Sequence, residues 1–161
     1  MSQQSTGGFL IATGIIFCGI FLAFDHTLNQ PAPNFSLQEI YGSRVDLANY
    51  RGRSVLLVFW TTSCGICRRE LPMLSRLRPE LGNKGVSILA IHLGDREDAR
   101  DYLRSNHIDL TAVADPEYVA GRAYHVSGVP KLVLIDGDGR IRRSSSGWLG
   151  ADAVRNWVAE N

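Results

Sequence analysis

Apolar residues along this chain form short continuous runs in some places and evenly spaced stripes in others. Residues 55–60 are apolar at every position, which is typical of a strand buried on both faces of a sheet. The runs at residues 86–93 and 131–135 are similar and predict two further strands. Between residues 71 and 81, leucines recur every three or four positions, which predicts a helix with one apolar face.

Shorter patterns between these runs predict the remaining elements. They are indicated by alternation, capping residues and turn residues, and fall at residues 35–47 (a hairpin), 95–106 (a helix), 110–114 (a strand), 115–124 (a helix opened by Asp115 and Pro116), 136–139 (a hairpin turn), 141–145 (a strand) and 151–160 (a helix). This order predicts an α/β domain with a mixed sheet, helices on both of its faces, and an N-terminal β-hairpin extension.

The N-terminal stretch has a different pattern. Residues 9–24 contain no charged side chain, and a helix of about 18 residues, counting Gly7 and Gly8, reaches roughly 27 Å, close to the ~30 Å core of a bilayer. A cleaved signal is the alternative, but no Lys or Arg precedes Arg44, and Phe21 to Ala23 is a poor cleavage site. The expected organisation is a tail (1–8), a single transmembrane anchor (9–24), a linker (25–33) and a folded domain (34–161).

Composition and charge argue against several classes of function. With 17 Lys and Arg against 16 Asp and Glu, the net charge of +1 gives no electrostatic basis for binding nucleic acid. Three cysteines are too few for a small disulfide-stapled domain. Cys18 lies inside the apolar N-terminal stretch, whereas Cys64 and Cys67 form a close pair. The four histidines lie at no ligand spacing relative to this pair, so we expect no metal site.

The pair Cys64 and Cys67 lies where the apolar strand ends and the leucine-striped helix begins. Unpaired N–H groups at a helix N-terminus favour a thiolate, so Cys64 is expected to be the nucleophile. Cys67, one turn deeper, is placed to attack a mixed disulfide on Cys64 and release the partner. Half of a zinc site and a purely structural disulfide are the alternatives, although so short a loop gains little stability from closure.

The stretch FWTTSCGICRRELP, residues 59–72, resembles the active-site segment of thioredoxin-like proteins. It is most similar to the membrane-anchored TlpA, ResA and CcmG (DsbE) group. Residues 32–37, 50–52 and 129–130 also match that group, and the resemblance covers residues 31–161. It implies a thioredoxin-like fold and a thiol–disulfide oxidoreductase.

The resemblance also assigns roles to four residues. Cys64 matches the nucleophile and Cys67 the resolving thiol, while Pro130 matches a cis-proline that lies against the disulfide. Glu70 matches an acid that tunes the thiols and handles protons. Because residues three positions apart share a helix face, Glu70 can lie near Cys67, raise the pKa of its thiol and accept its proton. The alternative is an acid placed only to favour the helix dipole.

Substrate contact is assigned by the same resemblance. The backbone of Val129 is expected to meet an extended client segment, with Trp60, Gly65 and Ile66 beside it. The Gly65-Ile66 spacer departs from the family, which usually has Pro before the second cysteine. Spacer chemistry shifts the redox potential, so the direction of electron flow stays open at this point.

The resemblance implies an extracytoplasmic (periplasmic), membrane-anchored enzyme that reduces disulfides in client proteins. The resemblance implies apocytochrome c as a client in cytochrome c maturation, a membrane electron donor that recharges the dithiol, and no cofactor beyond the Cys64–Cys67 pair. A peroxiredoxin-like peroxidase is one alternative, but its motif needs Pro where Leu57 stands, although Thr61 matches. A copper chaperone is another, but similar copper proteins have a three-residue spacer.

Overall fold

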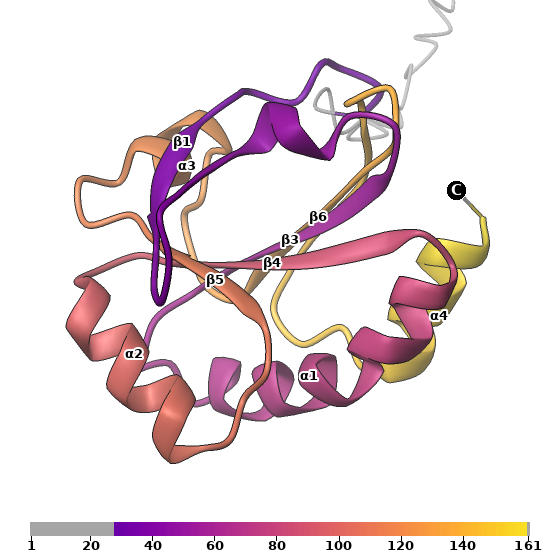
Figure 1. Cartoon of the computed structure of the whole chain (residues 1–161). Coiled ribbons are helices and arrows are strands. Elements are labelled where there is room, and N and C mark those ends of the chain that lie inside the picture. Colours follow the sequence, from indigo (N-terminus) through magenta and orange to yellow (C-terminus); the bar gives the residue numbers. More distant parts are fainter. Residues whose placement is uncertain (1–27, 161) are drawn as a thin grey trace, which may run out of the picture.

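The computed structural model describes residues 28–160 and shows one seven-stranded mixed sheet with helices on both faces (Figure 1). The strands are β1 (Ser36–Glu39), β2 (Arg44–Asp46), β3 (Ser54–Trp60), β4 (Val86–His92), β5 (Thr111–Ala114), β6 (Lys131–Ile135) and β7 (Ile141–Ser146). The helices are the 3-10 helix η1 (Leu47–Tyr50), α1 (Cys67–Asn83), α2 (Arg96–Ser105), α3 (Val119–Ala123) and α4 (Ala151–Ala159). The strand order is β2-β1-β5-β4-β3-β6-β7. The predicted α/β class, mixed sheet and hairpin are confirmed.

Strand β3 lies inside the sheet, as its apolar run predicts. It pairs in parallel with β4 along its whole length and antiparallel with β6. Because side chains alternate along a strand, Leu56 and Val58 enter one core layer while Leu57 and Phe59 enter the other. A strand that serves two layers must be apolar at every position, which explains the run.

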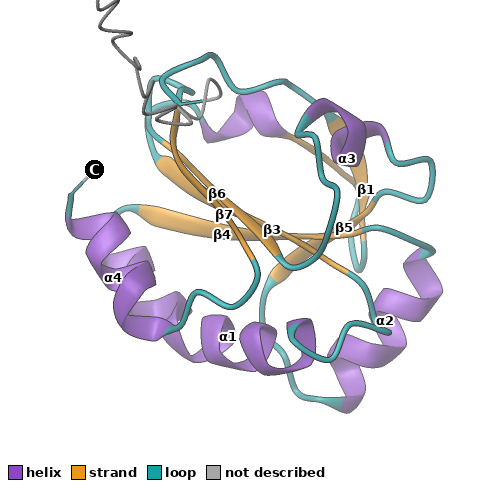
Figure 2. Cartoon of the chain, turned by 180° about the vertical axis from the view of Figure 1, so that it is seen from behind, coloured by secondary structure: helices purple, strands orange, loops and turns teal. Residues whose placement is uncertain are grey.

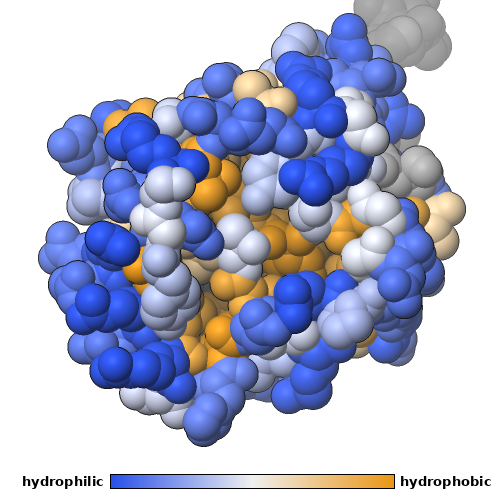
Figure 3. Space-filling view, in the orientation of Figure 1, coloured by the Kyte–Doolittle hydropathy of each residue, from blue (hydrophilic) through white to orange (hydrophobic). Residues whose placement is uncertain are grey.

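The helices divide between the two faces of the sheet. Figures 1 and 2 show α1, α2 and α4 on one face and α3 on the other, beside the β1–β2 hairpin. The leucine stripe of α1 is buried against the sheet, through Leu71, Leu74, Leu77 and Leu81. Figure 3 shows polar side chains around the margins of one side of the molecule and apolar surface in a recess between them. The helix that the leucines between residues 71 and 81 predict is thus confirmed as α1, and the leucine stripe is its buried face.

Helix α3 is shorter than the sequence predicts. We expected it to begin directly after Asp115, but it spans only Val119–Ala123. Tyr118 has a left-handed backbone (φ 59°), which breaks the helical path before Val119. Asp115 still caps the helix from a distance, because its Oδ1 and Oδ2 accept the N–H groups of Val119 and Gly121 at 2.7 and 2.8 Å.

The predicted linker needs a partial correction. Residues 29–32 belong to the folded domain, because Asn29 and Ala32 donate backbone hydrogen bonds to Ile141 and Gly139 at 2.6 and 2.9 Å. The predicted anchor at residues 9–24 and the first residues of the linker lie outside the described residues. Within residues 28–160, no helix combines the length and apolar character that crossing a membrane requires.

Candidate active site

The turn between β3 and α1 carries both cysteines and is held by polar contacts. The Thr62 hydroxyl donates to Asp98 Oδ2 at 2.8 Å, and Arg68 Nε donates to the Thr62 carbonyl at 3.0 Å. The Cys64 N–H donates to the Thr61 carbonyl at 3.4 Å. A buried strand thus ends in a polar turn that is tied to both α1 and α2, which fixes where the cysteines lie.

Cys64 and Cys67 form a disulfide, with their Cα atoms 5.2 Å apart. Cys67 is the first residue of α1 and is 1% exposed, whereas Cys64 precedes the helix and is partly exposed. The Cys67 N–H points at Cys64 Sγ from 3.1 Å. Because such N–H groups favour negative charge, the sulfur that a client can reach is also the sulfur that the helix end stabilises as a thiolate.

The carbonyl of Val129, the residue before Pro130, lies against this disulfide. The antiparallel pairing of β6 with β3 brings the start of β6 to the end of the sheet that carries the cysteines. The Val129 carbonyl oxygen lies 3.5 Å from Cys64 Sγ, and the Val129–Pro130 peptide bond is cis, as the resemblance implies. Residues far apart in the sequence therefore meet at Cys64.

Glu70 lies in the first turn of α1 and is fully buried (0% exposed). Its Oε1 accepts a hydrogen bond from the Leu149 N–H at 3.2 Å, and its Oε2 is buried without a partner. Desolvation by burial raises the pKa of Glu70 from 4.5 to about 7, and the Leu149 hydrogen bond partly opposes this rise. A carboxyl with this pKa, one helical turn from Cys67, can exchange a proton near neutral pH.

The expected substrate-contact residues separate into two groups. Gly65 and Ile66 are exposed, and Ile66 presents 45% of its surface beside Cys64. Trp60, in contrast, is fully buried, and its ring packs against those of His92 and Tyr102 with centroids 4.7 and 5.4 Å away. Trp60 therefore supports the active-site turn from inside the core. In this structure its side chain has no exposed surface that a client could contact.

Sequence reasoning missed the loop between β7 and α4, which supplies the Leu149 amide to Glu70. Its neighbour Trp148 is 45% exposed and stacks with Arg69, whose Cζ lies 5.1 Å from the ring centroid. The signal in the sequence was Gly147 and Gly150, whose φ angles of 86° and 78° let the chain turn sharply on either side of Trp148.

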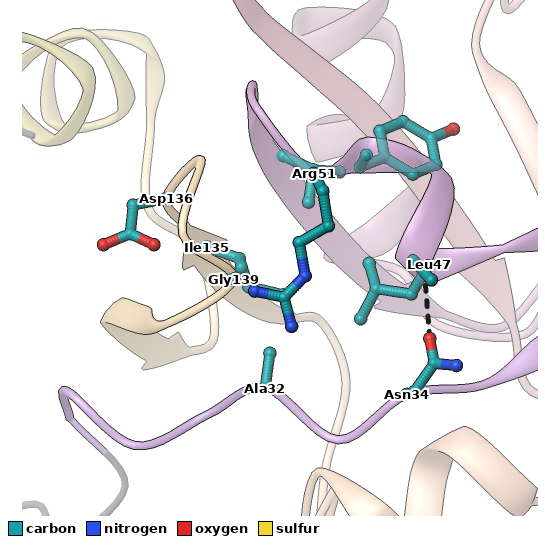
Figure 4. A pocket seen from close by; sticks show the side chains of 10 residues that line it. Ala32, Asn34, Leu47, Arg51, Ile135, Asp136 and Gly139 are labelled. Atoms are coloured by element: carbon teal, nitrogen blue, oxygen red, sulfur yellow. Dashed lines mark hydrogen bonds between the residues drawn. The ribbon is translucent and has the colours of Figure 1, made fainter.

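The pocket in Figure 4, of about 190 Å³, lies at the other end of the sheet from the cysteines. The Arg51 guanidinium reaches across it to the Asp138 carbonyl, and Asn34 Oδ1 accepts the Ala48 N–H at 3.0 Å. The first contact joins the residue after η1 to the β6–β7 turn, and the second joins η1 to the segment before β1, so the pocket lies between elements that hold the fold together. Among residues 28–160, no group of three or more His, Cys, Asp or Glu side chains is arranged to hold a metal ion.

Comparison with known proteins agrees with this geometry. The AhpC/TSA family matches residues 28–144. The thiol–disulfide oxidoreductase ResA of Bacillus subtilis is 28% identical over 128 residues, which cover 79% of this chain and 72% of that protein. ResA of Geobacillus kaustophilus is 32% identical over 123 residues, covering 76% and 71%.

Solved structures show the same relationship. A Chlorobium tepidum protein described as a thiol:disulfide interchange protein DsbE is 28% identical, with a TM-score of 0.77 over 83% of this chain and 96% of that one. StoA of Bacillus subtilis, at 22% identity and a TM-score of 0.70 over 78% and 96%, shares the fold. With its disulfide-bonded CxxC pair on a thioredoxin-like fold, the chain belongs to the AhpC/TSA family and is a thiol–disulfide oxidoreductase of the ResA and DsbE type.

Proposed function

We propose that this oxidoreductase works as a reductase, in which Cys64 attacks a client disulfide and Cys67 resolves the intermediate. The asymmetry of the pair carries the order of attack, and the resemblance to the TlpA, ResA and CcmG group supports the reducing direction. Cys64 is partly exposed and faces a helix N–H, whereas Cys67 is buried on the helix turn that holds Glu70. A client sulfur can reach only the first of these two positions without moving the helix.

The reaction passes two electrons to the client. The Cys64 thiolate attacks one sulfur of the client disulfide, forming a mixed disulfide and expelling the other client sulfur as a thiolate. The Cys67 thiol then loses its proton to Glu70 and attacks Cys64 Sγ. This step closes the Cys64–Cys67 disulfide and releases the second client thiolate. Burial of Glu70 supports the proton transfer, because its raised pKa of about 7 lets it take up a proton near neutral pH.

The direction of electron flow is tested by the reduction potential of the pair. The full-length protein is equilibrated with graded thiol–disulfide buffers, and its free thiols are quantified by alkylation. We expect a midpoint below about −200 mV, in the range of reducing members of this fold, because the strong oxidant DsbA lies near −120 mV. A midpoint above about −150 mV would instead make the protein an oxidant.

We also propose that the domain lies outside the cytoplasm, tethered by residues 9–24 and recharged by a membrane electron donor. One observation supports the tether: residues 29–32 join the domain beside the β6–β7 turn, at the end opposite Cys64. A tether at that end leaves the disulfide free to meet clients.

Apocytochrome c is the client that the family resemblance favours, because its CxxCH thiols must be reduced before haem attachment. A strain lacking the protein is expected to lose covalent cytochrome c haem, detected by haem staining of a gel. Wild-type protein should restore the haem and Cys64→Ala should not. Normal haem staining in the deletion strain would remove apocytochrome c as the client and leave the reductase proposal standing.

A further inference from the structure

Residues 147–150, between β7 and α4, contact the active site at three points. Each contact joins this loop to the cis-proline or to the first turn of α1: the Gly147 N–H donates to the Pro130 carbonyl at 2.8 Å, the Leu149 N–H donates to Glu70 Oε1 at 3.2 Å, and the Trp148 ring lies 5.1 Å from Arg69 Cζ. One short loop therefore connects the two sides of the redox site.

Trp148 and Leu149 hold the loop in different ways. Leu149 is partly buried and packs against the core that α1 and the sheet share. Trp148 is 45% exposed and contributes little to that core, but its stack with Arg69 joins the loop to the helix that carries Glu70. The flanking glycines allow the turn without fixing it, because glycine tolerates many backbone conformations.

We propose that Trp148 is a positioning residue for Glu70: by stacking with Arg69 it keeps the Leu149 amide on the Glu70 carboxyl, and so sets how tightly this carboxyl holds a proton. An N–H donor favours the carboxylate over the carboxylic acid. The bond from the Leu149 N–H is the one hydrogen bond that the Glu70 side chain makes among the described residues, since Oε2 has no partner. Loosening the loop therefore removes the group that offsets the cost of burial. The inference rests on the proposed proton-accepting role of Glu70.

Three arginines on the surrounding elements are engaged with groups other than Glu70. They pair with other groups as follows: Arg68 with the Thr62 carbonyl, Arg155 with Glu80 and Asp152, and Arg143 with Glu160. Strands β3 and β6 contribute apolar side chains to this core layer, among them Val58 and Leu132. The causes that shift the pKa of Glu70 are accordingly burial and the Leu149 amide.

The test follows the Glu70 carboxyl directly, by pH titration of its ¹³C side-chain NMR signal in the oxidised, full-length protein in detergent. Trp148→Ala is expected to raise the pKa of Glu70 by about half a unit to one unit, a three- to tenfold tighter hold on the proton. Trp148→Phe keeps an aromatic face for Arg69 and should restore most of the wild-type value. Tyr41→Ala, which removes an exposed ring elsewhere, is the matched control and should change nothing.

If Trp148→Ala does not fold, Trp148→Leu replaces it, because leucine keeps apolar bulk but offers Arg69 no ring. An unchanged Glu70 titration in these variants would overturn the inference, as would a shift in Trp148→Phe equal to that in Trp148→Ala. Faster or slower client reduction without any shift would also overturn it, since Trp148 would then only contact the client.

Alkylation of the reduced thiols separates this inference from the proposed role of Glu70. Trp148→Ala should shift the pH profile of alkylation in the wild-type background and leave it unchanged in the Glu70→Gln background. If the Glu70 signal shifts in Trp148→Ala while Glu70→Gln leaves the alkylation profile untouched, the positioning role of Trp148 stands and the proton-accepting role of Glu70 fails.

Discussion

Two opposing effects set the pKa of the Glu70 carboxyl. Burial disfavours its charged form, whereas the Leu149 amide favours it, and burial is the larger effect because the pKa rises from 4.5 to about 7. A buried acid with one unpaired oxygen lowers the stability of the folded state once it is ionised. Its place in a first helical turn beside a redox-active cysteine favours a function in proton transfer.

The first prediction concerns stability and pH. Because the pKa of Glu70 is 4.5 in the unfolded state and about 7 in the folded state, the folded state binds this proton more tightly. The stability of the folded protein that depends on a protonated Glu70 is therefore fully present below pH 4.5 and is lost as the pH rises through 7. Glu70→Gln imitates the protonated form at every pH. Relative to the wild type, its free energy of unfolding should rise by about 2–3 kcal/mol between pH 5 and pH 8.

Urea unfolding of the oxidised proteins at both pH values measures this difference. Glu117→Gln, in the exposed turn before α3, is the matched control and should show no such change between the two pH values. A constant difference between Glu70→Gln and the wild type would show that Glu70 does not titrate in this range.

At this scale the sequence predicted part of the site. Cys67 and Glu70 are three positions apart on α1 and share a helix face, and Cys64 lies three residues before Cys67, so their proximity follows from the chain itself. The resemblance added Pro130. Leu149 was not predictable, because its contact joins residues 79 positions apart through a backbone amide that any residue carries.

Among the elements, those with a strong apolar pattern were predicted within a few residues. β3, β4, α1 and β6 are examples, because burial on a known face fixes their period. Helix α3 has only five residues, and its start depends on the left-handed backbone of Tyr118, which is not signalled by any pattern of apolar positions. The Asp115 side chain caps this helix: it is 1% exposed and accepts the N–H groups of Val119 and Gly121, which have no acceptor within the helix.

The second prediction tests this cap. Asp115→Ala leaves the part-buried N–H of Val119 and the buried N–H of Gly121 without acceptors, and should lower the free energy of unfolding by about 2–3 kcal/mol. Asp115→Asn keeps one acceptor oxygen and should cost roughly half as much. Urea unfolding gives both values, and amide hydrogen exchange should show faster exchange at Val119 and Gly121 in Asp115→Ala. Equal stability of all three proteins would show that the cap is not needed.

In the molecule as a whole, the two cysteines and residues 29–32, which begin the folded domain, lie at opposite ends of the sheet. The cysteines follow β3 at one end, and residues 29–32 pair beside the β6–β7 turn at the other. The mixed sheet and its two helical layers were predictable from the order of patterns. The pairing of residues 29–32 with the β6–β7 turn was not predictable. Residues 25–33 form a polar stretch with two prolines, which resembles a free linker.

The third prediction concerns the tether, which lies outside the described residues. The full-length protein should stay with the membrane fraction after an alkaline carbonate wash, and deletion of residues 9–24 should release the domain. A thiol reagent that does not cross membranes should label Cys64 in intact spheroplasts after reduction. Labelling only after lysis would place the domain on the cytoplasmic side and contradict the proposed location.

The order of attack at the disulfide is the central claim, and trapping of clients tests it most directly. In cells that produce Cys67→Ala, clients should accumulate as mixed disulfides on Cys64, visible on a non-reducing gel and identifiable by mass spectrometry. Cys64→Ala should accumulate none, because the remaining Cys67 is buried at the start of α1. Mixed disulfides on Cys67 in Cys64→Ala, with none in Cys67→Ala, would contradict the account.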